Sequence, residues 1–313
     1  MARLRVALIG AGYMGRLHAE KLAAREDVEL VAVADADRAR AEAAAARWNC
    51  ASSADWRELL GRAEAVVVAV PTERHAEVAR AFLEAGAHVL LEKPIAATLA
   101  QAEDLVRAAR AAGRVLQVGH VERFNAAFRA LASRMGRPLY IDAERLSGFK
   151  QRGADVDVVL DLMIHDLDLA AALARSPVTG VSACGFRVLT RDIDIANARV
   201  EFAGGCVASV TASRVSQSAL RKLRVFQPEL YVSADLQAGR LRYVRQTDDA
   251  IAEREEDHAG GDALAEQAAG FVAAARGAAP PVVSGEDGVR ALELALTVGR
   301  LVRERLERYA GGA

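Results

Sequence analysis

Short apolar runs alternate with amphipathic, alanine-rich stretches through the first third of the chain. The apolar runs lie at 4–9, 28–34, 65–70, 88–91 and 115–118. The stretches between them carry apolar residues at helical spacing and lie at 16–25, 37–47, 74–85 and 98–112. Continuous apolar runs separated by helices are typical of a parallel sheet that is covered on both faces. The pattern therefore predicts an α/β domain with a doubly wound parallel sheet, which is the Rossmann arrangement.

The pattern changes near residue 120. Runs of alternating apolar and polar residues follow at 139–145, 178–188, 196–202, 207–212, 220–226, 230–234 and 241–244. Such alternation predicts strands with one buried and one polar face, and hence a large, open, mostly antiparallel sheet. We also expect a helix over 156–174, a mobile charged loop over 246–262 and a packed terminal helix over 288–309. The prediction is two domains, a dinucleotide-binding Rossmann domain over 1–119 and an α+β domain over 120–313.

Composition and charge narrow the class of protein. Hydrophobic residues make up 52% of the 313 residues and charged residues 27%, which indicates a globular chain and excludes a disordered or collagen-like one. Lys plus Arg number 41 against 42 Asp plus Glu, so the chain has no net field to attract nucleic acid or an anionic membrane.

The spacing of the cysteines and the length of the apolar runs indicate in which cellular compartment the protein is expected. The three cysteines are widely spaced and form no Cys-x-x-Cys pair, which favours a reducing compartment and argues against a structural zinc site. No apolar run approaches the ~20 residues of a membrane span, and glycines interrupt the first run where a signal peptide would continue. We therefore expect a soluble, cytoplasmic protein.

A glycine motif follows the first predicted strand and opens the first predicted helix. Gly10 can make the tight turn, Gly12 allows a pyrophosphate to approach the backbone, and Gly15 allows close packing of helix and strand. Asp35 ends the second strand, where an acid can accept hydrogen bonds from the adenosine ribose. Its charge repels a 2′-phosphate and favours NAD over NADP. Binding of NADP stays an alternative because of the nearby Arg38. Asp35 could also cap the following helix.

The tripeptide Glu92-Lys93-Pro94 follows the strand at 88–91, at the edge of the sheet where open α/β folds bind ligands. Only four of the 41 basic residues are lysines, and the rest are arginines. An Arg stays protonated under all ordinary conditions, whereas a Lys can exchange its proton when it is buried. Lys93 is therefore a candidate for proton chemistry, with a solvated charge as the alternative.

The segment Asp161-Leu-Met-Ile-His165-Asp166-Leu-Asp168 lies in the helix expected over 156–174. Asp161, His165 and Asp168 fall on one helical face, where a carboxylate can orient and stabilise an imidazole. His titrates near neutral pH, which suits a general acid or base. The alternative is a structural histidine. No third ligand accompanies this group, so we expect no metal site.

Two further groups of residues carry weaker signals. Arg123 and Asn125 lie at the expected domain junction, a usual place for a small-molecule site, although Arg123 could instead hold the domains together. A basic cluster on predicted strands could meet a phosphate, or could belong to a solvated sheet face or a subunit contact; its members are Arg214, Arg221, Lys222 and Arg224.

Over nearly its whole length, the chain resembles the Gfo/Idh/MocA family of oxidoreductases. The motifs that carry the resemblance are, in order, GAGYMG, VVVAVPTERHAEVA, LLEKPIAATLAQAEDL and DLMIHD. The resemblance implies a Rossmann domain followed by an α+β domain with an open sheet, often oligomeric through that sheet. It implies that Lys93 and His165 act at the reacting hydroxyl with Asp161 in support. It also implies cofactor contacts from Tyr13, Met14, Pro71, Thr72, His75, Glu92 and His120, and substrate contacts from Arg123, Phe124 and Asn125.

Within that family, the chain is similar to the bacterial UDP-N-acetylglucosamine 3-dehydrogenases. The similarity lies in the segments VGHVERFN and DLMIHDLDL and in residues 192–236. This similarity implies NAD-dependent oxidation of the sugar C3 hydroxyl, with a partner transaminase that makes a 3-amino sugar for lipid A. One departure is Ala126, where the subgroup pattern leads us to expect Pro. Two alternatives remain: a dehydrogenase of a free cyclic polyol such as inositol, and a non-catalytic dinucleotide sensor. We expect a homo-oligomer, a dimer or tetramer, and no nucleic-acid partner.

Overall fold

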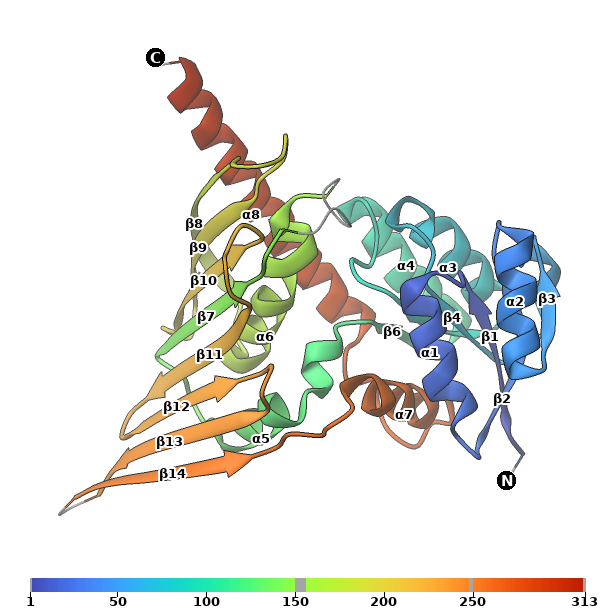
Figure 1. Ribbon diagram of the computed structural model, residues 1–313, viewed down its shortest axis with the longest axis horizontal. Helices are drawn as coiled ribbons and strands as arrows, with labels where there is room; N and C mark the ends of the chain where they lie inside the picture. Colours follow the sequence, from blue (N-terminus) through green and yellow to red (C-terminus); the bar gives the residue numbers. More distant parts are fainter. Residues whose placement is uncertain (1, 150–155, 248–249, 312–313) are drawn as a thin grey trace. The chain divides into compact units, whose positions relative to one another are not determined.

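The computed structural model describes residues 2–149, 156–247 and 250–311 (Figure 1). The chain forms two compact units, and each is built from two separate stretches of sequence. The first unit contains residues 1–124 and 262–289, and the second contains residues 125–261 and 290–313. Residues 262–289, which the sequence analysis placed with the second domain, thus belong to the first compact unit.

The first unit is built on a six-stranded parallel sheet in the order β3-β2-β1-β4-β5-β6. Its strands are β1 (Leu4–Ile9), β2 (Val28–Ala34), β3 (Ala51–Ser53), β4 (Ala65–Val68), β5 (His88–Leu91) and β6 (Leu116–Val118). This order reverses direction between β1 and β4, which is the point where doubly wound sheets bind their ligands. The predicted fold class is confirmed, and only the three-residue β3 was not expected.

Helices cover the parallel sheet, and local signals in the sequence explain where one of them begins and ends. They are α1 (Tyr13–Ala23), α2 (Arg38–Trp48), α3 (His75–Glu84), α4 (Leu99–Ala112) and α7 (Ala263–Ala275). Thr98 and Gln101 form a reciprocal capping box at the start of α4, and Gly113 ends it in the left-handed conformation. Short 3₁₀ turns connect other elements at Trp56–Leu59, Thr72–Arg74 and Val121–Phe124.

Helix α7 packs against α1, which explains why a late segment of the chain joins the first unit. Phe271 and Val272 of α7 share a hydrophobic cluster with Ala19 and Leu22 of α1. Arg276, just past the end of α7, donates a hydrogen bond of 2.8 Å to the carbonyl of Asp27. The alanine-rich sequence of α7 gave no clear amphipathic pattern, so this helix was not predicted.

The second unit is built on an eight-stranded sheet in the order β14-β13-β12-β11-β7-β10-β9-β8. Strands β7 and β10 pair in parallel, and the other neighbours pair antiparallel, which confirms the mostly antiparallel prediction. The strands are β7 (Tyr140–Leu146), β8 (Val178–Phe186), β9 (Ile195–Phe202), β10 (Val207–Ser213), β11 (Leu220–Gln227), β12 (Leu230–Asp235), β13 (Arg240–Gln246) and β14 (Ile251–Asp257).

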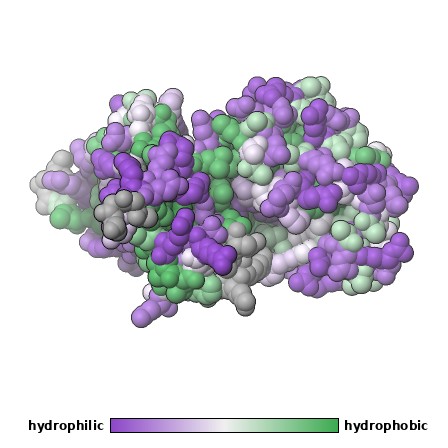
Figure 2. Space-filling model, turned by 90° about the horizontal axis from the view of Figure 1, so that it is seen from above, coloured by the Kyte–Doolittle hydropathy of each residue, from purple (hydrophilic) through white to green (hydrophobic). Residues whose placement is uncertain are grey.

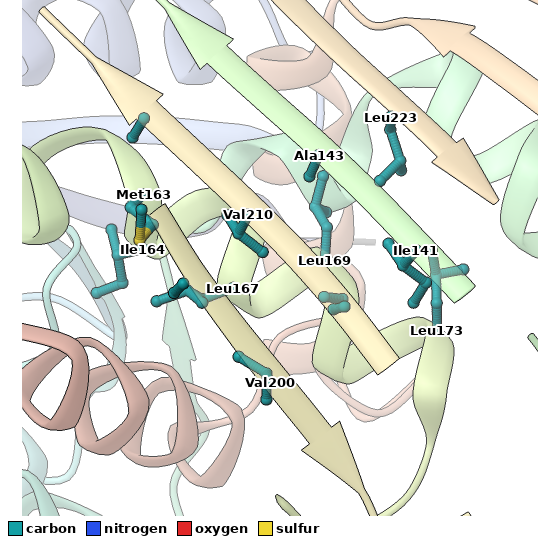
Figure 3. Packing of buried hydrophobic residues seen from close by; sticks show 14 of the residues in the cluster. Ile141, Ala143, Met163, Ile164, Leu167, Leu169, Leu173, Val200, Val210 and Leu223 are labelled. Carbon is teal, nitrogen blue, oxygen red and sulfur yellow. The ribbon is translucent and has the colours of Figure 1, made fainter. Parts of the chain in front are cut away.

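Helices of the second unit pack on one face of this sheet (Figure 1). They are α5 (Ala126–Arg134), α6 (Ile164–Ala174) and the part of α8 (Gly285–Gly311) that belongs to this unit, and a π-helical turn over Val159–Met163 leads into α6. Figure 3 shows Leu167 and Leu169 of α6 packed with Ile141 of β7 and Val210 of β10, all fully buried. The helix expected over 156–174 therefore begins later, at Val159, and residues 150–155 lie outside the described part.

The opposite face of the eight-stranded sheet is polar and partly exposed. In β7 the buried Ile141 and Ala143 alternate with Tyr140, Asp142 and Glu144, which face the other side. The cross-strand partners of this outward row on β11 are Phe226, Arg224 and Lys222. In the described part of the second unit, no helix covers this face, as the alternating pattern predicted.

The prediction of a mobile loop over 246–262 is wrong, because β14 occupies its centre. Strand β14 pairs antiparallel with β13, and Arg242 of β13 makes an ion pair of 2.9 Å with Glu253. The strand is almost fully exposed. Its sequence therefore lacks the alternation of apolar and polar residues from which the other strands were predicted. Ladder hydrogen bonds and cross-strand charge pairs stabilise this edge strand, and its charges discourage pairing with another sheet.

Hydrophilic side chains cover most of the first unit in the view of Figure 2. The exposed positions of its helices are largely Arg and Glu. Within residues 2–149, 156–247 and 250–311, none of the helices has the length and apolar character of a membrane-spanning segment.

Replacement of Phe271 by Ala is expected to lower the free energy of unfolding by about 3–5 kcal/mol, because this ring is fully buried between α7 and the rest of the first unit. Urea unfolding followed by circular dichroism measures the change. Phe186→Ala serves as the control, since that ring is 56% exposed and its removal should change the free energy by less than about 1 kcal/mol. Equal losses in the two variants would contradict the assignment of α7 to this core.

Candidate functional site

Two glycines in the turn between β1 and α1 are required by close backbone contacts. Gly10 has a φ of +95°, and a Cβ there would lie 2.5 Å from the carbonyl oxygen of Ala69, just beyond β4. A Cβ at Gly15 would lie 1.8 Å from the carbonyl oxygen of Gly10. A side chain at either position would therefore separate β1 from β4 or α1 from β1.

Gly12 differs from these two glycines because the space beside it is open. A Cβ there would meet nothing within 4 Å. Gly12 is also the N-cap residue of α1 and has no side chain to bond the first N–H groups of the helix. Free N–H groups at a helix N-terminus attract an anion such as a pyrophosphate. Tyr13, which is 54% exposed, and the half-buried Met14 are the first two residues of this helix.

Asp35 connects the end of β2 to the glycine turn. Its carboxylate accepts hydrogen bonds from the backbone N–H of Ala11, at 2.7 Å, and of Asp37, at 2.9 Å. Asp37, rather than Asp35, caps α2 by accepting from the N–H of Arg40, so the alternative role of Asp35 as the helix cap is wrong. The carboxylate stays at the edge of the sheet beside the glycine turn, where it can meet a ribose.

Arg40 is a neighbour of Asp35 that was not among the predicted site residues. Its guanidinium lies 3.5 Å from the Asp35 carboxylate and 3.4 Å from that of Asp37. Arg38, which was identified, is the exposed first residue of α2. The position of Arg40 three residues after the capping Asp37 could have revealed it, because a helix places those two residues on one face.

Pro71 and Thr72 lie between β4 and α3, and the buried His75, the first residue of α3, ties this loop to the loop after β5. His75 has Nδ1 2.8 Å from the carbonyl oxygen of Pro94 and Nε2 2.9 Å from that of Val70. Burial lowers the pKa of His75, and the two carbonyls only partly offset that effect.

Glu92 and Lys93 form the turn that follows β5. The Glu92 carboxylate lies 2.6 Å from Nε2 of the fully buried His18 of α1, and the Lys93 side chain is half-buried. Burial alone would raise the pKa of Glu92, but His18 and nearby positive charges hold it below its usual value. The carboxylate is therefore ionised at neutral pH. His120, which follows β6 at the same edge, is buried and donates its backbone N–H to the carbonyl of Val118.

The residues of the first unit fit a dinucleotide. The glycine turn, Asp35, the loop after β4 and the Glu92-Lys93-Pro94 turn all lie at the carboxyl edge of one parallel sheet. Gly12 leaves room for a pyrophosphate at the start of α1, and Asp35 offers a carboxylate for ribose hydroxyls. In the described residues we find no cluster of acidic, His and Cys side chains arranged to hold a metal.

Asp161 and His165 belong to the second unit, where they lie at the change from the π-helical turn to α6. Asp161 is in the turn Val159–Met163, His165 is the second residue of α6, and both side chains are half-buried. π-Helical turns are rare and occur often at functional sites. Asp168, predicted on the same helical face, is buried.

A buried ion pair attaches α6 to the sheet next to His165. Arg145 of β7 donates from Nε and from a terminal nitrogen to the two carboxylate oxygens of Asp166, at 2.7 and 2.9 Å. Both side chains are almost fully buried. Arg145 was not among the predicted site residues. Its place in the inward row of β7, after Ile141 and Ala143, is nevertheless unusual for an Arg, because such positions are normally apolar.

Arg123, Phe124 and Asn125 are placed by contacts within their own units. Arg123 lies 3.3 Å from the Asp287 carboxylate, and Phe124 is buried, both in the first unit. Asn125 caps α5 by accepting from the N–H groups of Ala127 and Phe128. Ala126, where Pro was expected, is the first residue of that helix, a position that suits Pro because its N–H needs no partner within the helix.

Two members of the basic cluster predicted on the second sheet, Arg224 and Arg214, have internal partners. Arg224 contacts Asp142 at 2.5 Å and Glu144 at 2.7 Å, and Lys222 lies beside it in the same outward row. Arg214 is buried and donates to the carbonyls of Val156 and Ile193. Arg221 is exposed. These contacts favour the structural interpretation of the cluster over a phosphate site.

Asp194 organises the loop before β9, next to Arg214. Its carboxylate accepts from the backbone N–H groups of Val188, Leu189 and Thr190, and its side chain is fully buried. Burial alone would raise the pKa of Asp194, but these donors outweigh it and lower the pKa to about 2.

Comparison with known proteins gives two family matches. The model described as "Oxidoreductase family, NAD-binding Rossmann fold" matches residues 4–120, and the "GFO/IDH/MocA C-terminal domain" matches residues 106–229.

Individual relatives match over nearly the full length. The UDP-N-acetylglucosamine 3-dehydrogenase of Acidithiobacillus ferrooxidans is 35% identical over 98% of this chain and 100% of its own. A solved structure of that enzyme, GnnA, superposes with a TM-score of 0.91 over 96% of this chain and 98% of its own. Inositol 2-dehydrogenase of Rhizobium meliloti is 27% identical over 96% of this chain and 98% of its own.

Substitutions of Gly15 and Gly12 should have different effects, the first on folding and the second on cofactor binding. Gly15→Ala is expected to destabilise the protein by more than about 4 kcal/mol, because its Cβ overlaps a backbone oxygen. Gly12→Ala should keep the wild-type melting temperature but bind NAD at least about tenfold more weakly, because its methyl group occupies the space for the pyrophosphate. Thermal unfolding and NAD titration by fluorescence measure these effects. Unchanged NAD affinity in Gly12→Ala would contradict the placement of the pyrophosphate.

The loop held by Asp194 should make stability sensitive to acid. A carboxyl whose pKa is lower in the folded state than in the unfolded state stabilises the protein above about pH 4, and this stabilisation disappears as the pH falls towards 2. We expect Asp194 to contribute about 2 kcal/mol at pH 7. Urea unfolding between pH 2 and pH 7 should show a smaller acid dependence for Asp194→Asn than for wild type. The exposed Asp192→Asn is the control, and an equal change in that variant would argue against this role.

Proposed function

Because the chain belongs to the Gfo/Idh/MocA family of oxidoreductases with an NAD-binding Rossmann fold, we propose that it oxidises the C3 hydroxyl of UDP-N-acetylglucosamine with NAD. The observation that carries the proposal is the nearly full-length similarity to an enzyme with that activity. The product would be the 3-keto sugar. A partner transaminase would convert it to a 3-amino sugar for lipid A, in the cytoplasm, where the free thiols of Cys50, Cys184 and Cys206 would stay reduced.

The first unit supplies the groups that would hold the dinucleotide. The glycine turn and the N-terminus of α1 would bind the pyrophosphate, and Asp35 would accept hydrogen bonds from the ribose hydroxyls. The Asp35 carboxylate would repel the 2′-phosphate of NADP, which favours NAD. Bound NAD supplies the acceptor for the hydrogen removed from the carbinol carbon. Further contacts would come from Tyr13, Met14, Arg38, Pro71, Thr72, His75, Glu92, Lys93 and His120.

Proton transfer is assigned to Lys93 and His165. His165 would take the proton of the substrate hydroxyl, since an imidazole exchanges protons near neutral pH, and Asp161 would orient it. Lys93 would donate a hydrogen bond to the same oxygen. A Lys at this position can also transfer a proton, whereas an Arg cannot, because its guanidinium stays charged. The ion pair between Arg145 and Asp166 supports this assignment, because it fixes the start of α6, where His165 lies. Arg123, Phe124 and Asn125 are the proposed substrate contacts.

A second candidate function is oxidation of a free cyclic polyol with the same cofactor. The match to an inositol 2-dehydrogenase over most of both chains favours it, at lower identity than the match to the UDP-sugar enzyme. A non-catalytic dinucleotide sensor is less consistent with the sequence, because a sensor needs none of Lys93, Asp161 and His165.

We place a homo-oligomer contact, in a dimer or tetramer, on the outward face of the eight-stranded sheet. This face carries an aromatic group of Tyr140, Phe226 and Tyr231, with ring centroids 5.7 and 4.8 Å apart in successive pairs. Arg224 lies beside it between Asp142 and Glu144. Aromatic residues and Arg are enriched in the cores of protein interfaces, which supports this choice.

The purified protein should reduce NAD when UDP-N-acetylglucosamine is added, as the absorbance of NADH at ~340 nm reports. Addition of a transaminase with an amino donor should increase the yield, because it removes the ketone. Free N-acetylglucosamine and myo-inositol, each tested with NAD and NADP, are the comparison substrates. A rate with inositol above that with every UDP-sugar would select the second candidate, and no turnover with any of them would refute both.

Lys93→Met should lower kcat by at least about a hundredfold while the dissociation constant of NAD changes less than about threefold, because the ammonium acts mainly at the reacting oxygen and contributes little to the affinity for the cofactor. Stopped-flow rates and NAD titration measure the two quantities. Lys21→Met is the matched control, since Lys21 makes only partly exposed ion pairs with Glu20 and Asp262. Loss of NAD binding in Lys93→Met would make Lys93 a cofactor residue only.

A further inference from the structure

Two buried histidines contact the Glu92-Lys93-Pro94 turn from different helices. His18 comes from α1 and His75 from α3, and both are almost fully buried. We propose that His18 and His75 are positioning residues that fix the turn carrying Lys93, His18 through the Glu92 carboxylate and His75 through the carbonyl of Pro94. This inference rests on the proposed function, in which Lys93 acts at the reacting hydroxyl.

The first contact links α1 to the backbone of Lys93. Nε2 of His18 lies 2.6 Å from Oε1 of Glu92, and Oε2 of Glu92 accepts from the N–H of Lys93 at 3.3 Å. One carboxylate therefore joins a helix side chain to the peptide group from which Lys93 projects. Since the pKa of Glu92 is lowered, its carboxylate is ionised and accepts at both oxygens.

Gly119, just after β6, leaves the Glu92 carboxylate little room to move. A Cβ at Gly119 would lie 3.0 Å from Oε1 and 3.2 Å from the Cα of Glu92. The N–H of Gly119 donates to the carbonyl of Leu91 at 2.7 Å, which holds the two loops together. Oε1 of Glu92 thus contacts His18 and also lies close to Gly119. A methyl group there would require the Glu92 side chain to shift by a few tenths of an ångström.

The second contact links the turn to the neighbouring loop after β4. Both ring nitrogens of His75 face backbone carbonyl oxygens, those of Pro94 and Val70. A carbonyl can only accept, so a neutral imidazole donates to one of them and an imidazolium to both. In either form, the ring spans the two loops. Because its polar atoms meet the backbone, His75 influences the site through loop position.

Three variants test the His18 contact, on which the proposal chiefly rests, and a fourth is the control. His18→Leu removes the donor to Glu92, His18→Gln keeps a donor, and Gly119→Ala keeps every polar group but crowds the carboxylate. His88→Gln is the matched control. His88 is a half-buried histidine at the other end of β5, and its Nδ1 accepts from the N–H of Val115.

Turnover is the first measurement. We expect kcat for NAD reduction with UDP-N-acetylglucosamine to fall at least about tenfold in His18→Leu and Gly119→Ala, since small displacements of a catalytic group are costly. His18→Gln should stay within about threefold of wild type, and His88→Gln should match wild type. The dissociation constant of NAD should change less than about threefold throughout. Equal kcat in all variants would overturn the proposal, as would a loss explained entirely by weaker NAD binding.

Lysine labelling is the second measurement and needs neither cofactor nor substrate. The chain has only four lysines, so mass spectrometry after brief acetic anhydride treatment can compare Lys93 with Lys21 in one sample. We expect the Lys93 to Lys21 ratio to change at least about threefold in His18→Leu and Gly119→Ala and to be unchanged in His88→Gln. An unchanged ratio in Gly119→Ala with a wild-type melting temperature would overturn the proposal.

The two measurements separate the possible failures. If wild type oxidises no sugar, the proposed function fails, and the labelling ratio still decides whether His18 and Gly119 control the position of Lys93. If wild type is active and the ratio does not respond, the positioning role fails alone. Because His18→Leu leaves a carboxylate without its partner, its melting temperature is measured first, and Gly119→Ala decides the outcome if that variant unfolds.

Discussion

The close contact of three backbone segments at Gly10 and Gly15 is the constraint on which the first unit depends. Strand β1, the start of α1 and the loop after β4 approach each other so closely that a single methyl group at either glycine would overlap a backbone oxygen. This contact brings the N-terminus of α1 to the point where the strand order reverses. The same approach leaves open space beside Gly12, so one steric requirement produces both a packed core and a place for an anion.

From this contact, polar links extend along the carboxyl edge of the sheet. Asp35 joins β2 to the glycine turn, His18 joins α1 to the loop after β5, and His75 joins that loop to the one after β4. Each link uses a buried or partly buried side chain whose partner is largely fixed by backbone geometry. The loops at this edge are therefore held to one another by side chains, which is consistent with the role proposed for Lys93.

Much of this arrangement could be predicted from the sequence, and the exceptions have physical causes. The glycine spacing and the apolar strands identify the parallel sheet because those signals are local. Strand β14 escaped prediction because its stability comes from pairing with β13 and not from burial. Arg145 was missed because its partner, Asp166, lies on a helix that the sequence does not place against β7. The position of α7 depends in the same way on contacts with α1.

Helix α7 has a consequence for how the chain folds. The hydrophobic cluster of the first unit includes Ala268, Phe271 and Val272, which are synthesised only after the last strand of the second sheet. A nascent chain that ends at Phe124 has all six strands of the parallel sheet but exposes the apolar surface that α7 later covers. The unit whose synthesis begins before that of the other unit is therefore completed only after the second sheet, and in the meantime this surface is available to chaperones or to other nascent chains.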